Sequence, residues 1–122
     1  YGFIVTNLVN GDMVGHTGII KAIHKAVSAV DACIGKIVEA GIENDYTLLI
    51  FADHGNAEDQ TAKWRTSHTL NKVPFVLVSG DDLLKNVQLK LHMGLKDIAP
   101  TVLELLGIKK PKEMTGESII KN

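Results

Sequence analysis

The sequence predicts an α/β fold in which helices flank part of a mostly parallel sheet. Short apolar runs rich in β-branched residues alternate along the chain with segments whose apolar residues recur every three or four positions. This alternation of strands and helices is typical of a layered α/β domain. The 122 residues are enough for one small domain, and 45% of them are hydrophobic, so a core is possible.

The first part of the chain predicts a strand, a loop and a long helix. Residues 3–9, FIVTNLV, form a β-rich apolar run that is expected to be a buried strand. The next stretch, NGDMVGHTG at 10–18, is expected to be a loop whose glycines permit positive φ or close approach to an ion. In residues 19–40 the apolar positions alternate in steps of three and four, which predicts a helix ended by Gly41.

Two further apolar runs, residues 46–52 and 75–79, have the length and composition of strands. The polar, irregular segment 56–72 between them is expected to be a surface loop. Three strands are few for such a sheet, and a central parallel strand with an open edge exposes unpaired backbone groups. The chain also starts at Tyr1, directly before the first apolar run. We therefore expect an N-terminal segment outside these residues to complete the sheet.

The last third of the chain predicts one helix and a docked tail. Residues 87–92 alternate apolar and polar side chains and suggest a short strand. Residues 97–106 predict a helix with Asp97 as its N-cap, and Gly107 is expected to end it. The polar tail closes on two isoleucines, residues 119–120, which are expected to pack on the core.

The overall charge and the single cysteine exclude several classes of protein. Thirteen Lys and Arg against fourteen Asp and Glu give a net charge of −1, which gives no sign of nucleic acid or an anionic membrane as a partner. No apolar stretch approaches the roughly 20 residues of a membrane span, and no signal peptide is recognisable. Cys33 has no partner for an internal disulfide, suits a reducing compartment, and is expected to pack as a small apolar side chain.

Acidic and histidine side chains follow two of the predicted strands. The first strand leads into Asp12 and His16, the second into Asp53 and His54, and His68 precedes the third. In open α/β sheets, ligands bind beyond the carboxyl ends of the strands, so these side chains are expected to meet at one rim. Two neighbouring carboxylates suppress each other's ionisation unless a cation lies between them. A metal ion resolves this conflict.

The types of side chain narrow the choice of metal. Carboxylates and imidazoles without thiolates suit Mn, Zn, Fe or Co better than Ca. Two aspartates and three histidines could complete the protein ligands of one ion and supply some of the ligands of a second. Paired ions about 3.5–4 Å apart are typical of enzymes that transfer phosphoryl groups. Neighbours on a strand point to opposite faces, so Asp53 and His54 could share an ion only if the chain bends, which Gly55 and Asn56 permit.

Other polar residues have weaker functional interpretations. Ser67 beside His68 suggests a nucleophile and its base, although no acid is placed to orient the histidine. The basic and aromatic residues at 63–65 suggest a solvated or lid-like loop, or a contact to phosphate. His24 and His92 have no companion donors and are expected to be ordinary surface or boundary residues.

The motifs NGDMVGHTG, ADHGNAED and SHTLNKVPFVL, in this order, resemble the C-terminal part of the cofactor-independent (2,3-bisphosphoglycerate-independent) phosphoglycerate mutases of the alkaline phosphatase superfamily. The closing KDIAPTVLELLGIKKPKEMTGESII is also similar, so the likeness covers nearly the whole chain. It implies that residues 1–122 are the C-terminal portion of an alkaline-phosphatase-like, metal-binding phosphatase domain. The nucleophile segment and an inserted transferase domain would lie outside them.

The resemblance also implies roles for five residues and two Mn²⁺ ions. Asp12, His16 and His68 match the ligands of one ion, and Asp53 and His54 match two ligands of the other. The second ion would be completed by an aspartate and the catalytic serine from the N-terminal part of the protein. No serine of these 122 residues matches the nucleophile, and the substrate-binding residues are expected elsewhere.

The implied reaction interconverts 3-phosphoglycerate and 2-phosphoglycerate through a phosphoserine, as in glycolysis and gluconeogenesis. The implied protein is a cytoplasmic isomerase, monomeric at full length, and residues 1–122 alone are expected to be inactive without the N-terminal part. Two alternatives stay open. One is another phosphomutase or metal-dependent phosphatase of the same superfamily, and the other is a catalytically silent metal-binding fragment.

Overall fold

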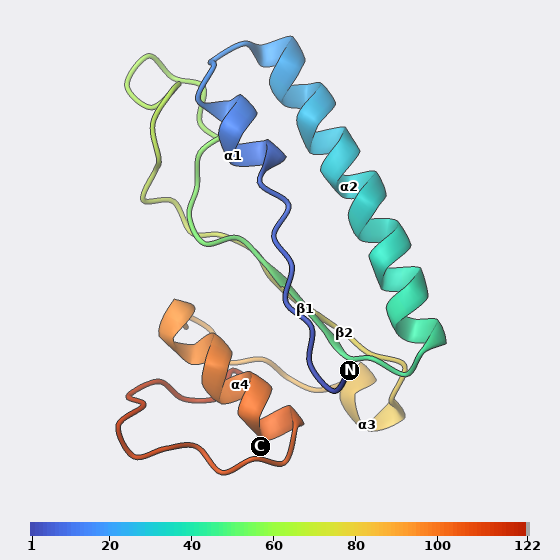
Figure 1. The fold of residues 1–122 in the computed structure, drawn as a ribbon. Helices are drawn as coiled ribbons and strands as arrows, with labels where there is room; N and C mark the ends of the chain where they lie inside the picture. The colour runs from blue at the N-terminus through green and yellow to red at the C-terminus, as the bar shows by residue number, and fades with distance from the viewer. Residues whose placement is uncertain (122) are drawn as a thin grey trace. The chain divides into compact units, whose positions relative to one another are not determined.

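The computed structural model describes residues 1–121, which form two compact units, one of Tyr1–Gly80 and one that begins at Asp81 (Figure 1). Unit 1 contains α1 (Asn10–Gly15), α2 (Ile20–Glu43), β1 (Leu48–Phe51) and β2 (Phe75–Val78), and unit 2 contains α3 (Asp82–Lys85), the 3-10 helix η1 (Leu95–Asp97) and α4 (Ile98–Leu105). The predicted mixture of helices and strands is confirmed. No helix among the described residues is long and apolar enough to cross a membrane.

The predicted strand at residues 3–9 is wrong for the part of the chain that the structure describes. Residues 1–8 have no regular secondary structure and form the coil at the blue end of the ribbon in Figure 1. The side chains of Phe3, Ile4 and Val5 are 56%, 61% and 76% exposed. A strand needs a neighbour for its backbone N–H and C=O groups, and no described strand pairs with this segment.

The stretch NGDMVGHTG is a helix followed by a turn, so the predicted loop is also wrong. Residues 10–15 form α1, and the N–H of His16 donates to the carbonyl of Asp12 to extend its last turn. Gly11 and Gly15, within α1, do not adopt positive φ, whereas Gly18, the last residue of the stretch, has φ of 61° in the turn to α2. Packing of α1 against α2 outweighs the low helix propensity of its glycines.

The predicted long helix is confirmed as α2, but it continues through Gly41 to Glu43. Its apolar stripe is only partly covered: Ile23 and Ala26 are buried, whereas other apolar positions of the helix are half-exposed. Cys33 is exposed, so the expectation that it packs as an apolar side chain is wrong. The described residues of unit 1 cover too little of this helix to bury the whole stripe.

The two remaining predicted strands of unit 1 are confirmed as β1 and β2, although each is shorter than predicted. They pair antiparallel, from Leu48 opposite Val78 to Phe51 opposite Phe75. The prediction of parallel pairing is therefore wrong for this pair. Parallel neighbours need a crossover, usually a helix, whereas the chain between β1 and β2 is the irregular loop that the sequence predicts.

In unit 2 the predicted helix is confirmed as α4, preceded by η1, and Gly107 with φ of 66° follows its end. Asp97 does not cap α4 with its side chain. The strand suggested at 87–92 reduces to one bridge, Leu89 opposite Ile120. The tail isoleucines are buried as predicted, with Ile119 and Ile120 only 4% and 5% exposed.

Candidate metal centre

Three predicted ligand atoms form a nearly equilateral triangle. Asp12 Oδ1 lies 3.2 Å from His16 Nε2 and 3.0 Å from His68 Nε2, and the two imidazole nitrogens are 3.1 Å apart. If an ion lies about 2.1 Å from each donor atom, neighbouring donor atoms are about 3.0 Å apart in octahedral geometry and about 3.4 Å apart in tetrahedral geometry. The three side chains therefore fit one face of the coordination shell of a divalent ion.

Helix α1 places the first two of these side chains. Asp12 and His16 are four residues apart, so the helix puts them on one face, one turn from each other. His16 Nδ1 donates to the carbonyl oxygen of Thr66 at 2.9 Å. Because that carbonyl can only accept, the bond fixes the histidine tautomer and leaves the Nε2 lone pair facing the triangle. The same contact joins α1 to the loop that carries His68.

Asp53 and His54 lie beside the triangle. The backbone bends at both residues, as expected for a shared site, and Asp53 Oδ1 is 3.6 Å from His54 Nε2. His54 Nε2 also lies 3.9 Å from Asp12 Oδ1, and its ring stacks on His68 with centroids 3.7 Å apart. The Asp53 side chain is 71% exposed, so this edge of the cluster is open to solvent. The structure thus brings Asp12, His16, His54 and His68 together, with Asp53 beside His54 at the edge of the cluster.

Two polar residues of the cluster, Asn56 and Glu58, are not among the ligands predicted from the sequence. The Asn56 side chain is buried, and its Nδ2 donates to Asp12 Oδ1 at 3.0 Å. The Glu58 carboxylate accepts from the Asn56 N–H at 2.5 Å and from Thr69 Oγ1 and Asn71 Nδ2. In the sequence, the signal for these two residues is the stretch GNAE, which directly follows the paired ligands Asp53 and His54. Glu58 ties the segment after β1 to the segment beside His68.

The environment of Glu58 favours its charged form. Loss of water contact opposes ionisation and by itself raises the pKa of the carboxyl group. Hydrogen bonds from Thr69, Asn71 and backbone N–H groups outweigh that effect and hold the pKa of Glu58 below its ordinary value. Glu58 is therefore a negatively charged acceptor at neutral pH, suited to holding several donors in place.

The basic and aromatic residues at 63–65 form a loop anchored to unit 1. Lys63 Nζ lies 4.7 Å from the centre of the Trp64 ring, and Arg65 Nε donates to the carbonyl of Gly18 at 3.1 Å. Ser67 precedes a histidine whose Nε2 faces Asp12 and His16, so the geometry gives no support to a serine nucleophile with His68 as its base. His24 is exposed on α2.

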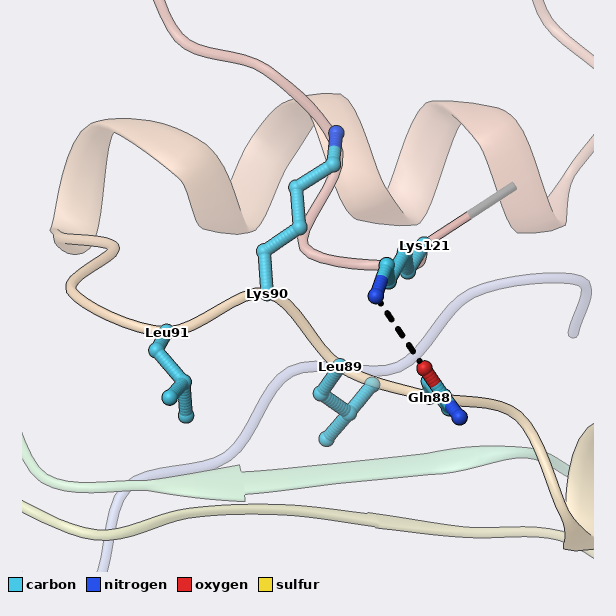
Figure 2. Close-up of a pocket in the computed structure, with 5 residues that line it drawn as sticks. All are labelled: Gln88, Leu89, Lys90, Leu91 and Lys121. Carbon is cyan, nitrogen blue, oxygen red and sulfur yellow. Dashed lines mark hydrogen bonds between the residues drawn. The ribbon is translucent and has the colours of Figure 1, made fainter.

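The described part of unit 2 has a shallow hollow, which Figure 2 shows with its lining residues Gln88, Leu89, Lys90, Leu91 and Lys121. Lys121 Nζ donates to Gln88 Oε1 at 3.2 Å, and Lys90 Nζ donates to the carbonyl of Ser118 at 2.8 Å. Both ammonium groups are thus engaged within the unit. Backbone hydrogen bonds join residues 88 and 90 to residues 121 and 119, so the hollow lies along two paired segments.

The profile of the Metalloenzyme superfamily matches residues 1–110, and the chain belongs to this superfamily. Membership and the clustered carboxylate and imidazole donors together imply dependence on a divalent metal ion.

Within the superfamily, the relatives are phosphoglycerate mutases, which confirms the resemblance seen in the motifs. The chain is 52% identical over 125 residues to a 2,3-bisphosphoglycerate-independent phosphoglycerate mutase of Parabacteroides distasonis, covering 99% of this chain and 24% of that protein. It is 50% identical to the protein of the same name in Gloeobacter violaceus, again with 24% of that protein covered. The chain thus spans about a quarter of the length of these relatives.

A solved structure has the same fold. The crystal structure of Leishmania mexicana phosphoglycerate mutase at low cobalt concentration matches with a TM-score of 0.79 and 33% sequence identity. The match covers 94% of this chain and 24% of that one. The arrangement of α1, α2 and the two strands is therefore an arrangement known from an experimentally determined mutase.

Proposed function

We propose that this chain forms part of the metal centre of a 2,3-bisphosphoglycerate-independent phosphoglycerate mutase, which interconverts 3-phosphoglycerate and 2-phosphoglycerate through a phosphoserine. The observation that carries the proposal is the triangle of Asp12 Oδ1, His16 Nε2 and His68 Nε2, with sides of 3.0–3.2 Å. It occurs in a chain that is half identical to named mutases.

In this proposal, Asp12, His16 and His68 hold one Mn²⁺, and Asp53 and His54 contribute to a second. Such ions, when bound, neutralise phosphoryl oxygens and lower the pKa of an attacking hydroxyl group. Residues 1–122 would be the C-terminal portion of the phosphatase domain. The nucleophilic serine, the other ligands and the residues that bind phosphoglycerate would come from the N-terminal part of a monomeric, cytoplasmic protein.

The donor set supports Mn²⁺ or Co²⁺ as the ion without selecting between them. Carboxylate and imidazole accept both, and the Leishmania mexicana structure is of a mutase at low cobalt concentration. Affinity alone favours the later first-row metals, so manganese would be chosen by its availability in the cell. What this chain contributes is a set of donors that the Thr66 bond to His16 and the Asn56 bond to Asp12 hold in place.

The activity is tested on the full-length gene product. With Mn²⁺ present we expect conversion of 3-phosphoglycerate to 2-phosphoglycerate, abolished by a chelator and restored by Mn²⁺. Asp12→Ala and His68→Ala are expected to abolish turnover. Release of phosphate from phosphate esters without mutase turnover would instead indicate a phosphatase of the same superfamily. Metal binding with neither activity would indicate a catalytically silent protein.

The assignment of ligands to two ions is tested by calorimetric titration of the same protein with Mn²⁺. Asp12→Ala and His68→Ala are expected to remove the first class of binding, because each deletes one corner of the triangle. Asp53→Ala is expected to leave that class intact and weaken the second. Asp59→Ala is the matched control, since its carboxylate accepts from Thr61 in the same loop. Equal loss of both classes in all three ligand variants would contradict the assignment.

A further inference from the structure

Asn56 is the most buried polar side chain beside the metal centre, with 5% of its surface exposed. Its Nδ2 donates to Asp12 Oδ1 at 3.0 Å and lies 3.3 Å from His16 Nε2. One amide nitrogen therefore faces two corners of the triangle at once. Its Oδ1 is buried and has no hydrogen-bond partner among the described residues. Of the two polar atoms of this amide, Nδ2 is the one that contacts the predicted ligands, so its contacts are the ones that can orient them.

Gly15 makes room for this amide. A β-carbon at residue 15 would lie 2.8 Å from Asn56 Cγ and closer still to Oδ1, whereas a β-carbon at Gly11 would meet nothing within 4 Å. Both glycines belong to α1 and both have ordinary helical backbone, so conformation does not explain the glycine at position 15. Close approach of the Asn56 side chain does.

We propose that Asn56 is a positioning residue that aims the Asp12 carboxylate at the metal ion, and that Gly15 is required so that Asn56 can reach it. The inference rests on the proposed metal centre. A carboxylate rotates about its Cβ–Cγ bond and can present either oxygen, so a single buried donor on Oδ1 selects one orientation. Oδ1 has a second lone pair and can bind an ion while it accepts from Asn56.

The Asn56 amide contacts one carboxylate and one imidazole of the proposed centre. Its Nδ2 faces both Asp12 Oδ1 and His16 Nε2 and keeps these two acceptors close together. An ion held by the His16 lone pair would leave the Nδ2 bond to Asp12 Oδ1 in place. When a residue that hydrogen-bonds to a metal ligand is replaced, the affinity for the metal typically falls by about 10- to 100-fold.

The test is Co²⁺ binding to the full-length gene product, measured by calorimetric titration and by the visible d–d absorption of the bound ion. Asn56→Ala is expected to weaken binding by about 10- to 100-fold and to change the d–d spectrum, with the circular dichroism spectrum unchanged. Gln60→Ala is the matched control, because that amide lies in the same loop and donates to the carbonyl of Ala57. Co²⁺ affinity of Asn56→Ala equal to that of Gln60→Ala would overturn the proposal.

A double-mutant cycle separates positioning from general damage. Gly15→Ala is expected to weaken Co²⁺ binding as Asn56→Ala does, because it displaces the amide. In the Asn56→Ala background, Gly15→Ala is expected to add nothing, whereas Gly11→Ala is neutral in both backgrounds. Losses that add in the double variant would overturn the link between Gly15 and Asn56. If Asn56→Ala does not fold, the Co²⁺ affinity of Gly15→Ala tests the proposal instead. That variant keeps the Asn56 side chain but displaces it from Asp12.

Failure of this inference and failure of the metal centre give different results. Asp12→Ala and His68→Ala are measured alongside. If both bind Co²⁺ as tightly as the parent protein, the metal centre itself is wrong. If both lose binding while Asn56→Ala does not, the centre stands and the role of Asn56 is overturned.

Discussion

The Asp97 carboxylate accepts two backbone hydrogen bonds, from two residues of unit 2 that are far apart from each other in sequence. The N–H of Glu117 donates to Oδ1 and the N–H of Gly94 to Oδ2, both at 2.8 Å, and the residue is only 2% exposed. The bonds from Glu117 and then Gly94 hold the pKa of Asp97 below its ordinary value, with help from the charges of Lys96 and Lys90 and against the effect of burial. The charged carboxylate joins the tail to the start of η1.

The lowered pKa of Asp97 predicts a pH dependence of the stability of unit 2. A carboxyl group whose pKa is lower when folded than when unfolded stabilises the fold above its unfolded pKa. That contribution is lost as the pH falls through the folded pKa, so unit 2 should weaken in acid. At neutral pH, Asp97→Asn is expected to cost about 2 kcal/mol and to flatten the acid dependence.

Hydrogen exchange of the amides of Gly94 and Glu117 measures this effect locally. In Asp97→Asn at neutral pH their protection should fall by about 30-fold, the equivalent of about 2 kcal/mol. Asp82→Asn is the control, because that carboxylate pairs with Lys85 on an exposed helix. Unchanged protection in Asp97→Asn would contradict the prediction.

Residue types allow the proposed metal ligands to be predicted, but not the residues that hold those ligands in place. Asp12, His16 and His68 can be proposed because clustered imidazole and carboxylate side chains have few uses other than metal binding. Asn56 cannot, because its role depends on a side-chain contact across 44 residues, and asparagine after a strand is equally typical of a turn. The sequence predicts Asp97 as a helix cap for the same reason: local sequence cannot show a partner 20 residues away.

At the scale of elements, helix α2 contains two glycines in contrasting surroundings. A β-carbon at Gly35 would meet nothing within 4 Å, whereas one at Gly41 would lie 2.9 Å from Leu48 Cδ1. Glycine within a helix is less stable than alanine by about 0.5–1 kcal/mol. Gly35→Ala is therefore expected to raise the free energy of unfolding by about that amount.

Gly41→Ala is expected to show less of this gain or none, because Leu48 at the start of β1 must move. Chemical denaturation followed by circular dichroism compares the two variants. An equal gain in both would show that the contact with Leu48 imposes no constraint.

Periodicity predicts the helices and strands with a clear apolar pattern and fails where an element depends on neighbours that the pattern cannot show. The apolar repeat of α2 and α4 and the compact apolar runs of β1 and β2 all appear in the fold. Residues 3–9 have the same kind of sequence as β1 but no pairing partner among the described residues. For α1, six residues with two glycines are too short to predict a helix without its packing on α2.

At the scale of the whole molecule, many large apolar side chains are exposed. Val5, Leu70, Leu83 and Leu91 are between 76% and 95% exposed. Apolar surface that gathers into large patches is typical of regions that contact other protein. Residues 1–122 produced alone are expected to bind a hydrophobic dye such as ANS strongly, to self-associate, and to lack mutase turnover.

Comparison with the full-length gene product at equal molar concentration measures the effect. ANS emission per molecule and the oligomeric state by sedimentation are the two readouts. If residues 1–122 stay monomeric and do not bind the dye, the exposed apolar side chains do not promote association, and the prediction is wrong. Mutase turnover by residues 1–122 alone would show that the nucleophile lies within them.

The half-buried Trp64 gives the loop beside His68 an intrinsic fluorescence signal. It is the only tryptophan among the 122 residues, its ring lies under the Lys63 ammonium group, and its carbonyl accepts the N–H of Ser67, next to His68. Indole emission responds to nearby charge and to water. In residues 1–122, tryptophan fluorescence therefore reports on one loop beside His68, and a titration with Mn²⁺ has a readout there that needs no added label.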